Sequence, residues 1–332
     1  MGRVAIVKPD HLGDLVLASP AMRAIWNRFG GGVEFFVSSA TIPLLRYFFP
    51  GAAEVHRTDL SHLAKGHSVN ITALELGDRL RRFDTVFFLR DDEALRQAAS
   101  CLSKAYVFGE GGHLTHDTAI QKRAVEGVIG SYSRTAHFSG TAIFWPKEIR
   151  SVGLCVAAGF PTNRWPNVYW MKLAQLLADE GIKPVLIGGP GERDELRVMS
   201  TALGSIPHNV IEGGADFGVF FERLAQVDLV VASDGGTAHL CSTKKPILSI
   251  FGSSPWRRYA PFGWNNVLIT RDLACSPCVQ FSSEEVNGCL SRECSAGITP
   301  DNVFRVIFSG GMDFSHLRGA KAFRGVSHAY EN

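Results

Sequence analysis

Several features of common protein classes are missing from this 332-residue sequence. It has no apolar run long enough to span a bilayer and no low-complexity tract. Its net charge of +2 is small for a protein that binds nucleic acid. A Gly-x-Gly-x-x-Gly motif is absent, which counts against a dinucleotide-dependent oxidoreductase. The N-terminus leads directly into an apolar segment without a signal peptide, so we expect a cytoplasmic protein.

The composition is that of a globular protein, 45% hydrophobic and 20% charged, and the length suggests two domains. Short β-rich runs alternate with helical patterns, which predicts parallel sheets with helices on both faces. The strands expected in the first half are Val4–Val7, Val33–Ser38, Thr85–Leu89 and Ala105–Gly109. Those expected in the second half are Val152–Ala157, Pro184–Gly189, Asn209–Glu212, Asp228–Ser233 and Pro246–Phe251, with helices at Val168–Glu180 and Glu192–Leu203.

We therefore predict an α/β protein of two doubly wound domains that face each other. The first covers residues 1–148 and the second residues 149–310, and we expect the tail, residues 311–332, to pack back on the first domain. Residues 59–82 and 110–143 are less regular and rich in His, Arg and Gly. We interpret them as loops of the first domain, where long loops often carry recognition.

The first candidate site is the stretch VAIVKPDHLGDLVLASPAMRAIW, residues 4–26, where a strand runs into two aspartates and a helix. Apolar residues at helical spacing predict that the helix begins near Asp14, and Gly13 would permit a tight turn before it. Ligands of open α/β sheets bind beyond the carboxyl ends of the strands, so this turn is in the right place for a site. By residue type alone, Asp10 is explained by the turn and Asp14 as the cap of the helix.

A second candidate site is VVASDGGTAHLCSTKKPILSIFG, residues 230–252, where a strand ends and a short helix opens at Thr237. Small residues before a helix allow backbone N–H groups to approach a phosphate, and the helix N-terminus favours negative charge. The residues concerned are Asp234, Gly235, Gly236, Thr237 and His239. A second strand-end loop, FGSSPWRR, follows at once and contains Ser253. Each loop alone is also explained as an ordinary turn.

Two further strand ends in the second half carry polar residues. In AAGFPTNRWPNVYW, residues 157–170, Thr162 and Arg164 precede a helix, and the Arg164 guanidinium suits a two-pronged contact with a diphosphate. In LIGGPGERDE, residues 186–195, Glu192 suits hydrogen bonds from a ribose. The alternatives are a surface arginine and a carboxylate that favours the start of a helix.

Four of the seven cysteines lie in CSPCVQFSSEEVNGCLSREC, residues 275–294. In a reducing compartment such a cluster suggests a metal more than disulfides. Four thiolates, from Cys275, Cys278, Cys289 and Cys294, suit tetrahedral zinc or iron. The expected role is structural, because four protein ligands leave no position open for a substrate. Unliganded thiols and two disulfides are the alternatives.

Together and in this order, these segments resemble glycosyltransferase family 9, the bacterial ADP-heptose transferases of lipopolysaccharide core assembly. The resemblance covers nearly the whole chain and is strongest in IVKPDHLGDLVLASPAMRAI and in SDGGTAH with PILSIFGSS. Where the family usually has Asp-Thr-Gly, this chain has Asp234-Gly235-Gly236, so a hydroxyl that commonly touches phosphate is missing at position 235. Members that heptosylate autotransporter proteins carry a similar cysteine finger that holds iron.

The resemblance implies a GT-B architecture, with the acceptor on the N-terminal domain and the nucleotide sugar on the C-terminal domain. It implies that Asp14 is the general base of an inverting transfer, beside Gly13, with Lys8 and His11 orienting it or binding an anionic acceptor. The departing diphosphate would be stabilised by Arg164, by Thr237 and by backbone N–H groups, without a catalytic metal. The donor-binding residues implied are Thr162, Arg164, Glu192, Asp234, Gly235, Gly236, Thr237, His239 and Ser253.

The implied partners are ADP-heptose and a glycan, glycolipid or protein acceptor, and we expect peripheral association with the inner face of the cytoplasmic membrane. A nucleotide-sugar epimerase and a non-catalytic nucleotide-sugar-binding protein are the alternatives. An epimerase would need its own acid–base pair within the donor domain, and the sequence shows no convincing set. Neither the acceptor nor the choice between zinc and iron follows from the sequence.

Overall fold

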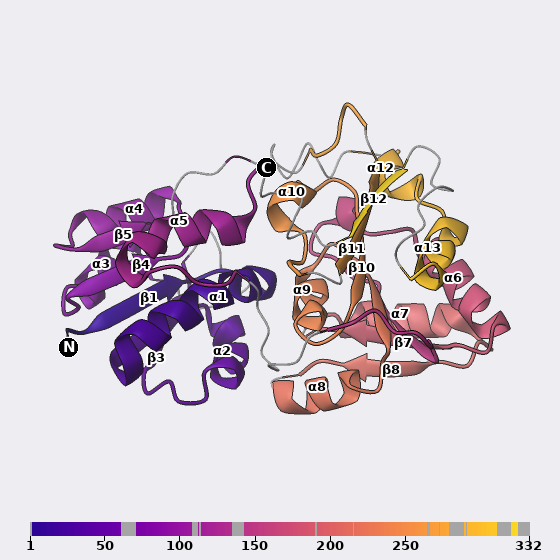
Figure 1. Ribbon diagram of the computed structural model, residues 1–332, viewed down its shortest axis with the longest axis horizontal. Helices are drawn as coiled ribbons and strands as arrows, with labels where there is room; N and C mark the ends of the chain where they lie inside the picture. The colour runs from indigo at the N-terminus through magenta and orange to yellow at the C-terminus, as the bar shows by residue number, and fades with distance from the viewer. Residues whose placement is uncertain are drawn as a thin grey trace. The chain divides into compact units, whose positions relative to one another are not determined.

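The computed structural model describes residues 2–60, 71–107, 112, 114–134, 143–189, 191–214, 216–263, 266–271, 273–278, 289, 291–310 and 320–324. The chain divides into two compact units, residues 1–136 and 137–332. In each unit, helices cover both faces of a sheet whose strands are mainly parallel, as the alternation of β-rich and helical segments predicts (Figure 1).

The described part of the first unit contains a five-stranded parallel sheet with the strand order β3-β2-β1-β4-β5. The strands are β1 (Val4–Lys8), β2 (Val33–Val37), β3 (Val55–Arg57), β4 (Thr85–Phe88) and β5 (Ala105–Val107). The helices are α1 (Leu12–Phe29), η1 (Gly30–Gly32), η2 (Ser39–Thr41), α2 (Ile42–Phe48), α3 (Ala73–Leu80), α4 (Glu93–Ser100) and α5 (Asp117–Ile129). All five residues of the central strand β1 are buried, as expected for a strand covered on both faces.

The described part of the second unit contains a seven-stranded sheet with the order β12-β11-β10-β9-β6-β7-β8. The strands are β6 (Ser151–Cys155), β7 (Lys183–Gly188), β8 (Asn209–Glu212), β9 (Leu229–Ser233), β10 (Ile247–Phe251), β11 (Asn266–Arg271) and β12 (Ala320–Arg324). The helices are η3 (Pro161–Asn163), α6 (Asn167–Asp179), α7 (Arg193–Leu203), α8 (Phe217–Leu224), α9 (Gly236–Ser242), α10 (Trp256–Tyr259), α12 (Glu293–Ala296) and α13 (Pro300–Phe308). Because β10, β9, β6 and β7 are neighbours, the loops that follow them meet at one edge of the sheet.

Two expectations about domain organisation differ from the structure. Trp145 and Ile149 pack against the core of the second unit, and Trp145 Nε1 donates a hydrogen bond to Ile307 O at 3.2 Å, so the join lies before residue 148. The described part of the C-terminal tail is β12, which pairs antiparallel with β11. This part of the tail therefore completes the second sheet, and the rest of the tail lies outside the described residues.

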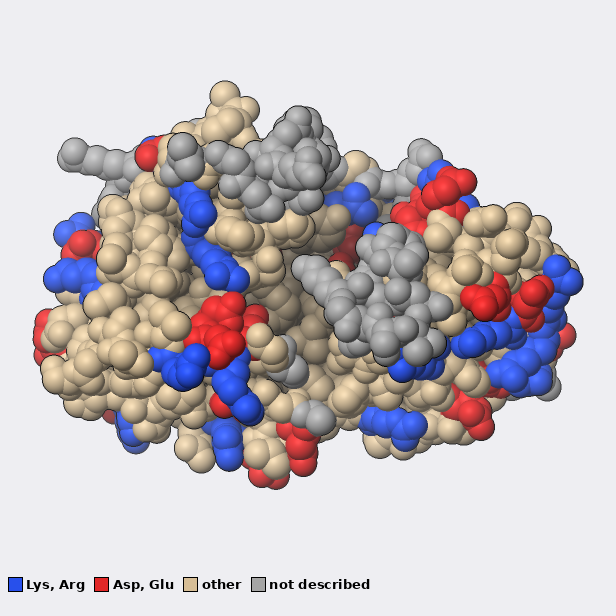
Figure 2. Space-filling model, turned by 180° about the vertical axis from the view of Figure 1, so that it is seen from behind, with Lys and Arg blue, Asp and Glu red and all other residues tan. Residues whose placement is uncertain are grey.

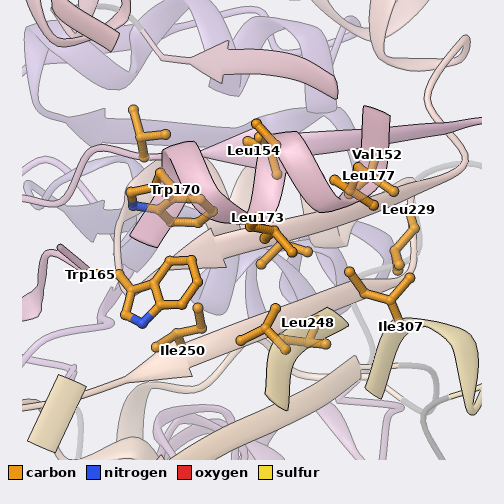
Figure 3. Packing of buried hydrophobic residues seen from close by; sticks show 14 of the residues in the cluster. Val152, Leu154, Trp165, Trp170, Leu173, Leu177, Leu229, Leu248, Ile250 and Ile307 are labelled. Carbon is orange, nitrogen blue, oxygen red and sulfur yellow. The ribbon is translucent and has the colours of Figure 1, made fainter. Parts of the chain in front are cut away.

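The core of the second unit anchors the loop that leads into α6. Trp165 and Trp170 are fully buried, and their rings meet edge to face with centroids 4.8 Å apart (Figure 3). Trp165 Nε1 donates to Ile298 O at 2.8 Å, and Trp165 N donates to Ser233 Oγ at 3.1 Å. Since both ends of this residue are held, the preceding Thr162–Asn163 segment is fixed against the end of β9.

On the face shown in Figure 2, described side chains of both charge signs are interspersed, and no single basic patch dominates. This distribution agrees with the small net charge of the sequence. Among the helices that the structure describes, none combines the length and apolarity needed to cross a bilayer.

Candidate active site

A buried ion network occupies the carboxyl end of β1. Lys8 Nζ lies 3.0 Å from Asp10 Oδ2, and Arg90 Nη1 donates to Asp10 Oδ1. Arg90 Nε also donates to Asp92 Oδ2 at 2.6 Å, and Ser38 Oγ donates to Asp10 O at 2.8 Å. Burial by itself would raise the pKa of Asp10, but the charges of Lys8 and Arg90 hold that pKa below its ordinary value. Asp10 is therefore an ionised link between two strand ends, not only a turn residue.

Asp14 lies beside this network in the first turn of α1. The N-cap residue of α1 is His11, whose side chain makes no capping hydrogen bond, so the explanation of Asp14 as the helix cap is wrong. Gly13 is buried inside the helix and is not among the residues with positive φ, so it does not form the tight turn we expected. With the residues that the structure describes, the half-buried Asp14 carboxylate makes no hydrogen bond or ion pair.

The electrostatic surroundings of Asp14 favour proton binding. Burial raises its pKa to about 6, and the negative charges of Asp10 and Asp117 act in the same direction. Lys8 and Arg90 lower the pKa but do not overcome the burial. Asp117 is the first residue of α5, which packs against α1. A carboxylate with a pKa near neutrality suits proton transfer at physiological pH.

In the second unit, hydrogen bonds join the loops after β6, β9 and β10. Asn163 Nδ2 donates to Asp234 Oδ2 at 2.9 Å and to Ser254 Oγ at 2.7 Å. Ser253 Oγ donates to Asn163 Oδ1 and lies 3.0 Å from Thr162 Oγ1. All five residues are buried, so this polar network holds the three loops in fixed relative positions.

Asp234 and Gly235 begin the turn into α9. Burial raises the pKa of Asp234 to about 6, while a hydrogen bond from Ser254 lowers it. Gly235 is extended, with φ of −166°. A Cβ atom at this position would lie 3.3 Å from Ala157 O and 3.4 Å from Ala158 Cα. The loop after β6 therefore leaves little room for a side chain at position 235.

Comparison with known proteins identifies the family. The model of glycosyltransferase family 9 (heptosyltransferase) matches residues 118–287, which is half of the chain. The chain belongs to glycosyltransferase family 9. Lipooligosaccharide heptosyltransferase 2 of Campylobacter jejuni subsp. jejuni serotype O:6 is 22% identical over 329 residues, which cover 92% of this chain and 98% of that protein.

Two solved structures share the fold. A family 9 glycosyltransferase from Veillonella parvula aligns with a TM-score of 0.69 and 17% identity over 93% of this chain and 97% of its own. The ADP-heptose lps heptosyltransferase II of E. coli aligns with a TM-score of 0.63 and 17% identity over 93% of this chain and 98% of its own. The expectations of a family 9 glycosyltransferase and of a two-domain GT-B fold are confirmed.

Two of the other predicted donor residues of this glycosyltransferase, Glu192 and Thr237, contact each other. Glu192 Oε2 accepts hydrogen bonds from Gly189 N and from Thr237 Oγ1, both at 2.7 Å. Arg164 is part-exposed, donates through Nε to Ala158 O at 3.2 Å, and pairs with Glu195 Oε1 at 3.2 Å. The Thr237 hydroxyl and the Arg164 guanidinium therefore both have protein partners. Gly236 is the first residue of α9, and His239 is buried in the same helix.

Two residues with central positions were not predicted. Asn163 connects three loops of the donor-side site. In the sequence, its charged neighbour Arg164 was the predicted donor residue of this segment. Arg90 binds Asp10 from 80 positions away in the sequence. The available signal was the RDD run directly after the predicted strand Thr85–Leu89, at the edge where ligands bind. Lys8, predicted to orient Asp14 or bind an acceptor, pairs with Asp10 and is one of the charges that act on Asp14, and His11 is exposed at the N-cap of α1.

The four clustered cysteines lie next to the loop after β10. Cys278 N donates to Ser253 O at 2.8 Å, and Ser276 Oγ donates to Gly252 O at 2.7 Å. A Cβ atom on Gly252 would lie 3.3 Å from Cys294 Sγ. Burial raises the pKa of Cys294 to about 11, and the other three thiols add to that effect. In the described part of the chain, no group of three or more His, Cys, Asp or Glu side chains is arranged to hold a metal ion.

Proposed function

We propose that this family 9 protein is an inverting glycosyltransferase that moves a heptose from ADP-heptose to a hydroxyl of a lipopolysaccharide-core or other glycan or protein acceptor. The position and the pKa of the Asp14 carboxylate support this proposal. It lies at the carboxyl end of β1, is part-exposed and has a pKa of about 6, whereas the cations beside it are taken up by Asp10.

In the proposed reaction, Asp14 accepts the proton of the acceptor hydroxyl as its oxygen attacks the anomeric carbon of the sugar. The bond from that carbon to the nucleoside diphosphate breaks, and the diphosphate leaves from the opposite face with the bonding electrons. Its negative charge would be met by the backbone N–H groups of residues 235–237 at the start of α9 and by Arg164. These groups act as fixed donors, so we expect no catalytic metal.

The donor is inferred from relatives. The E. coli structure is that of an ADP-heptose lps heptosyltransferase, and the Campylobacter relative is a lipooligosaccharide heptosyltransferase. On this basis we propose ADP-heptose as donor, a lipopolysaccharide-core saccharide or another glycan or protein as acceptor, and a location at the inner face of the cytoplasmic membrane. Thermal stabilisation by ADP-heptose, compared with UDP- and GDP-sugars, tests the choice of donor.

Replacement of Asp14 by Asn tests the proposed base. Turnover with ADP-heptose and lipopolysaccharide truncated in its inner core should fall at least about a hundredfold, which is the usual contribution of a general base. Donor affinity should be unchanged, since Asp14 lies in the other unit from the donor-side loops. Asp59→Asn is the control, because it makes the same change at a buried carboxylate of the same unit, which pairs with Arg57. Turnover near that of the wild type in Asp14→Asn would contradict the proposed mechanism.

We also propose that Cys275, Cys278, Cys289 and Cys294 bind one structural zinc or iron ion. Burial raises the pKa of Cys278 most, and the charges of Cys289 and Cys275 raise it further. A cation among these thiols would relieve the repulsion between their thiolates. Such an ion would brace the donor-side loop, because Ser276 and Cys278 donate hydrogen bonds to Gly252 and Ser253.

A further inference from the structure

We propose that Asp10 is a positioning residue for Asp14: it binds both Lys8 and Arg90 at the end of β1 and thereby keeps these cations from pairing with the Asp14 carboxylate. This inference rests on the proposed role of Asp14 as the general base. It assigns separate tasks to the two carboxylates of the Lys8–Asp14 segment, one to hold cations and one to accept a proton.

The geometry of Asp10 supports this separation. Its two carboxylate oxygens take different cations, Oδ2 that of Lys8 and Oδ1 that of Arg90, and the residue is only 1% exposed. Arg90 is also held by Asp92, which caps α4 by accepting a hydrogen bond from Leu95 N at 2.9 Å. Lys8 is thus paired at the end of β1, and Arg90 is paired both with Asp10 and with the N-cap residue of α4.

The consequence for Asp14 follows from the charges around it. An arginine that pairs with a carboxylate typically lowers its pKa by about 1–3 pH units, which would make Asp14 a weak base near neutral pH. With Asp10 in place, its negative charge partly cancels the effect of Lys8 and Arg90 on the pKa of Asp14. The net effect of Lys8, Asp10 and Arg90 then leaves burial as the dominant influence on Asp14.

The neighbouring elements contribute few other charges. Asp117, the first residue of α5, raises the pKa of Asp14, as Asp10 does. The N-cap residue of α5, His116, is buried, and its Nδ1 accepts a hydrogen bond from Thr118 N. The N-cap of α1 is the exposed His11. At the ends of β2 and β3, Asp59 is bound by Arg57 and by Ser39 N, and it is not among the groups that shift the pKa of Asp14.

The test measures the titration of Asp14 directly in the full chain, without substrates. Protein labelled with carbon-13 at the aspartate carboxyl groups is titrated by NMR, and the Asp14 signal is identified by its loss in Asp14→Asn. In Asp10→Asn the midpoint for Asp14 should fall by about one pH unit or more, because the charge of Asp10 no longer offsets those of Lys8 and Arg90. In Arg90→Met it should rise, because one cation is removed.

A shift of opposite sign in these two variants supports the proposal, since general loosening of the fold would move both midpoints in the same direction. Asp59→Asn, which removes a buried paired carboxylate from the same unit, should leave the midpoint unchanged. An unmoved or raised midpoint in Asp10→Asn overturns the proposal, and so does a lowered midpoint in Arg90→Met. Full turnover in Asp14→Asn would instead overturn the general-base assignment, an outcome that the NMR titration distinguishes.

Discussion

Asn163 Nδ2 lies 2.9 Å from Asp234 Oδ2, and this hydrogen bond joins the loop after β6 to the loop after β9. The same amide group also donates to Ser254 Oγ in the loop after β10. One buried side chain thus holds three loops of the second unit, which include most of the residues proposed to bind the donor. Among the residues that the structure describes, the neutral side chains of Asn163 and Ser254 donate hydrogen bonds to Asp234.

Asn163→Ala should therefore weaken nucleotide-sugar binding. The change leaves Asp234 and Ser254 with one hydrogen bond fewer, and a buried polar group without its partner costs about 1–3 kcal/mol. We expect ADP to bind roughly tenfold more weakly, as measured by calorimetry, since about 1.4 kcal/mol corresponds to a factor of ten. Asn167→Ala is the control, because Asn167 is exposed at the start of α6. Equal affinity in the two variants would contradict the role given to Asn163.

The pKa of Asp14 predicts the pH dependence of transfer. A general base works only when deprotonated, so kcat/KM should be constant above a pH of about 6 and fall about tenfold for each pH unit below it. In Asp14→Asn, the residual kcat/KM should not show this fall below pH 6. A wild-type profile that stays flat down to pH 5 would argue that proton acceptance by Asp14 does not limit the rate.

Asp234→Asn should stabilise the protein at neutral pH while it weakens donor binding. The folded-state pKa of Asp234 is about 6, above the ordinary 3.8, so the folded protein holds a proton that the unfolded chain has lost between these values. The free energy of unfolding therefore decreases as pH rises from about 4 to about 6, by at most about 3 kcal/mol from this group. Urea unfolding at pH 8 and at pH 4.5 checks this, because the gain in the variant should be larger at pH 8.

Arg164→Ala should lower the affinity for the diphosphate of the donor. Charge-assisted hydrogen bonds typically contribute about 1.5–3 kcal/mol, so we expect ADP to bind at least about tenfold more weakly. Glu195→Gln leaves Arg164 in place but removes the carboxylate that pairs with it at 3.2 Å. ADP affinity should stay equal or increase in that variant. If both variants bind ADP as the wild type does, Arg164 lies outside the donor site.

The cysteine hypothesis is tested by elemental analysis of protein purified without a metal-binding tag. We expect about one zinc or iron ion per chain. Cys278→Ser should lose the ion and, through the hydrogen bonds to Gly252 and Ser253, weaken ADP binding. Cys101→Ser is the control, since Cys101 lies in the other unit. Less than about a tenth of an ion per chain, together with four thiols that react freely in the folded protein, would exclude the site.

The sequence by itself determined the architecture, because hydrophobic periodicity is a local property. All nine predicted strands are present with ends that agree within about two residues, and their carboxyl ends carry the residues that the family motifs single out. β3, β11 and β12 were not predicted. β3 has only three residues, and the edge strand β12 depends on its pairing with β11.

The tertiary structure decided what the individual polar residues do. Both aspartates of the first motif were visible in the sequence, but not that Arg90 binds Asp10. Arg90 reaches Asp10 only because β1 pairs with β4. Likewise, Asn163 gained its role from the adjacency of β6, β9 and β10, and Lys8 and Thr237 proved to be bound by Asp10 and Glu192. The partner of a charged group depends on which strands lie side by side, and that choice involves residues far apart in the chain.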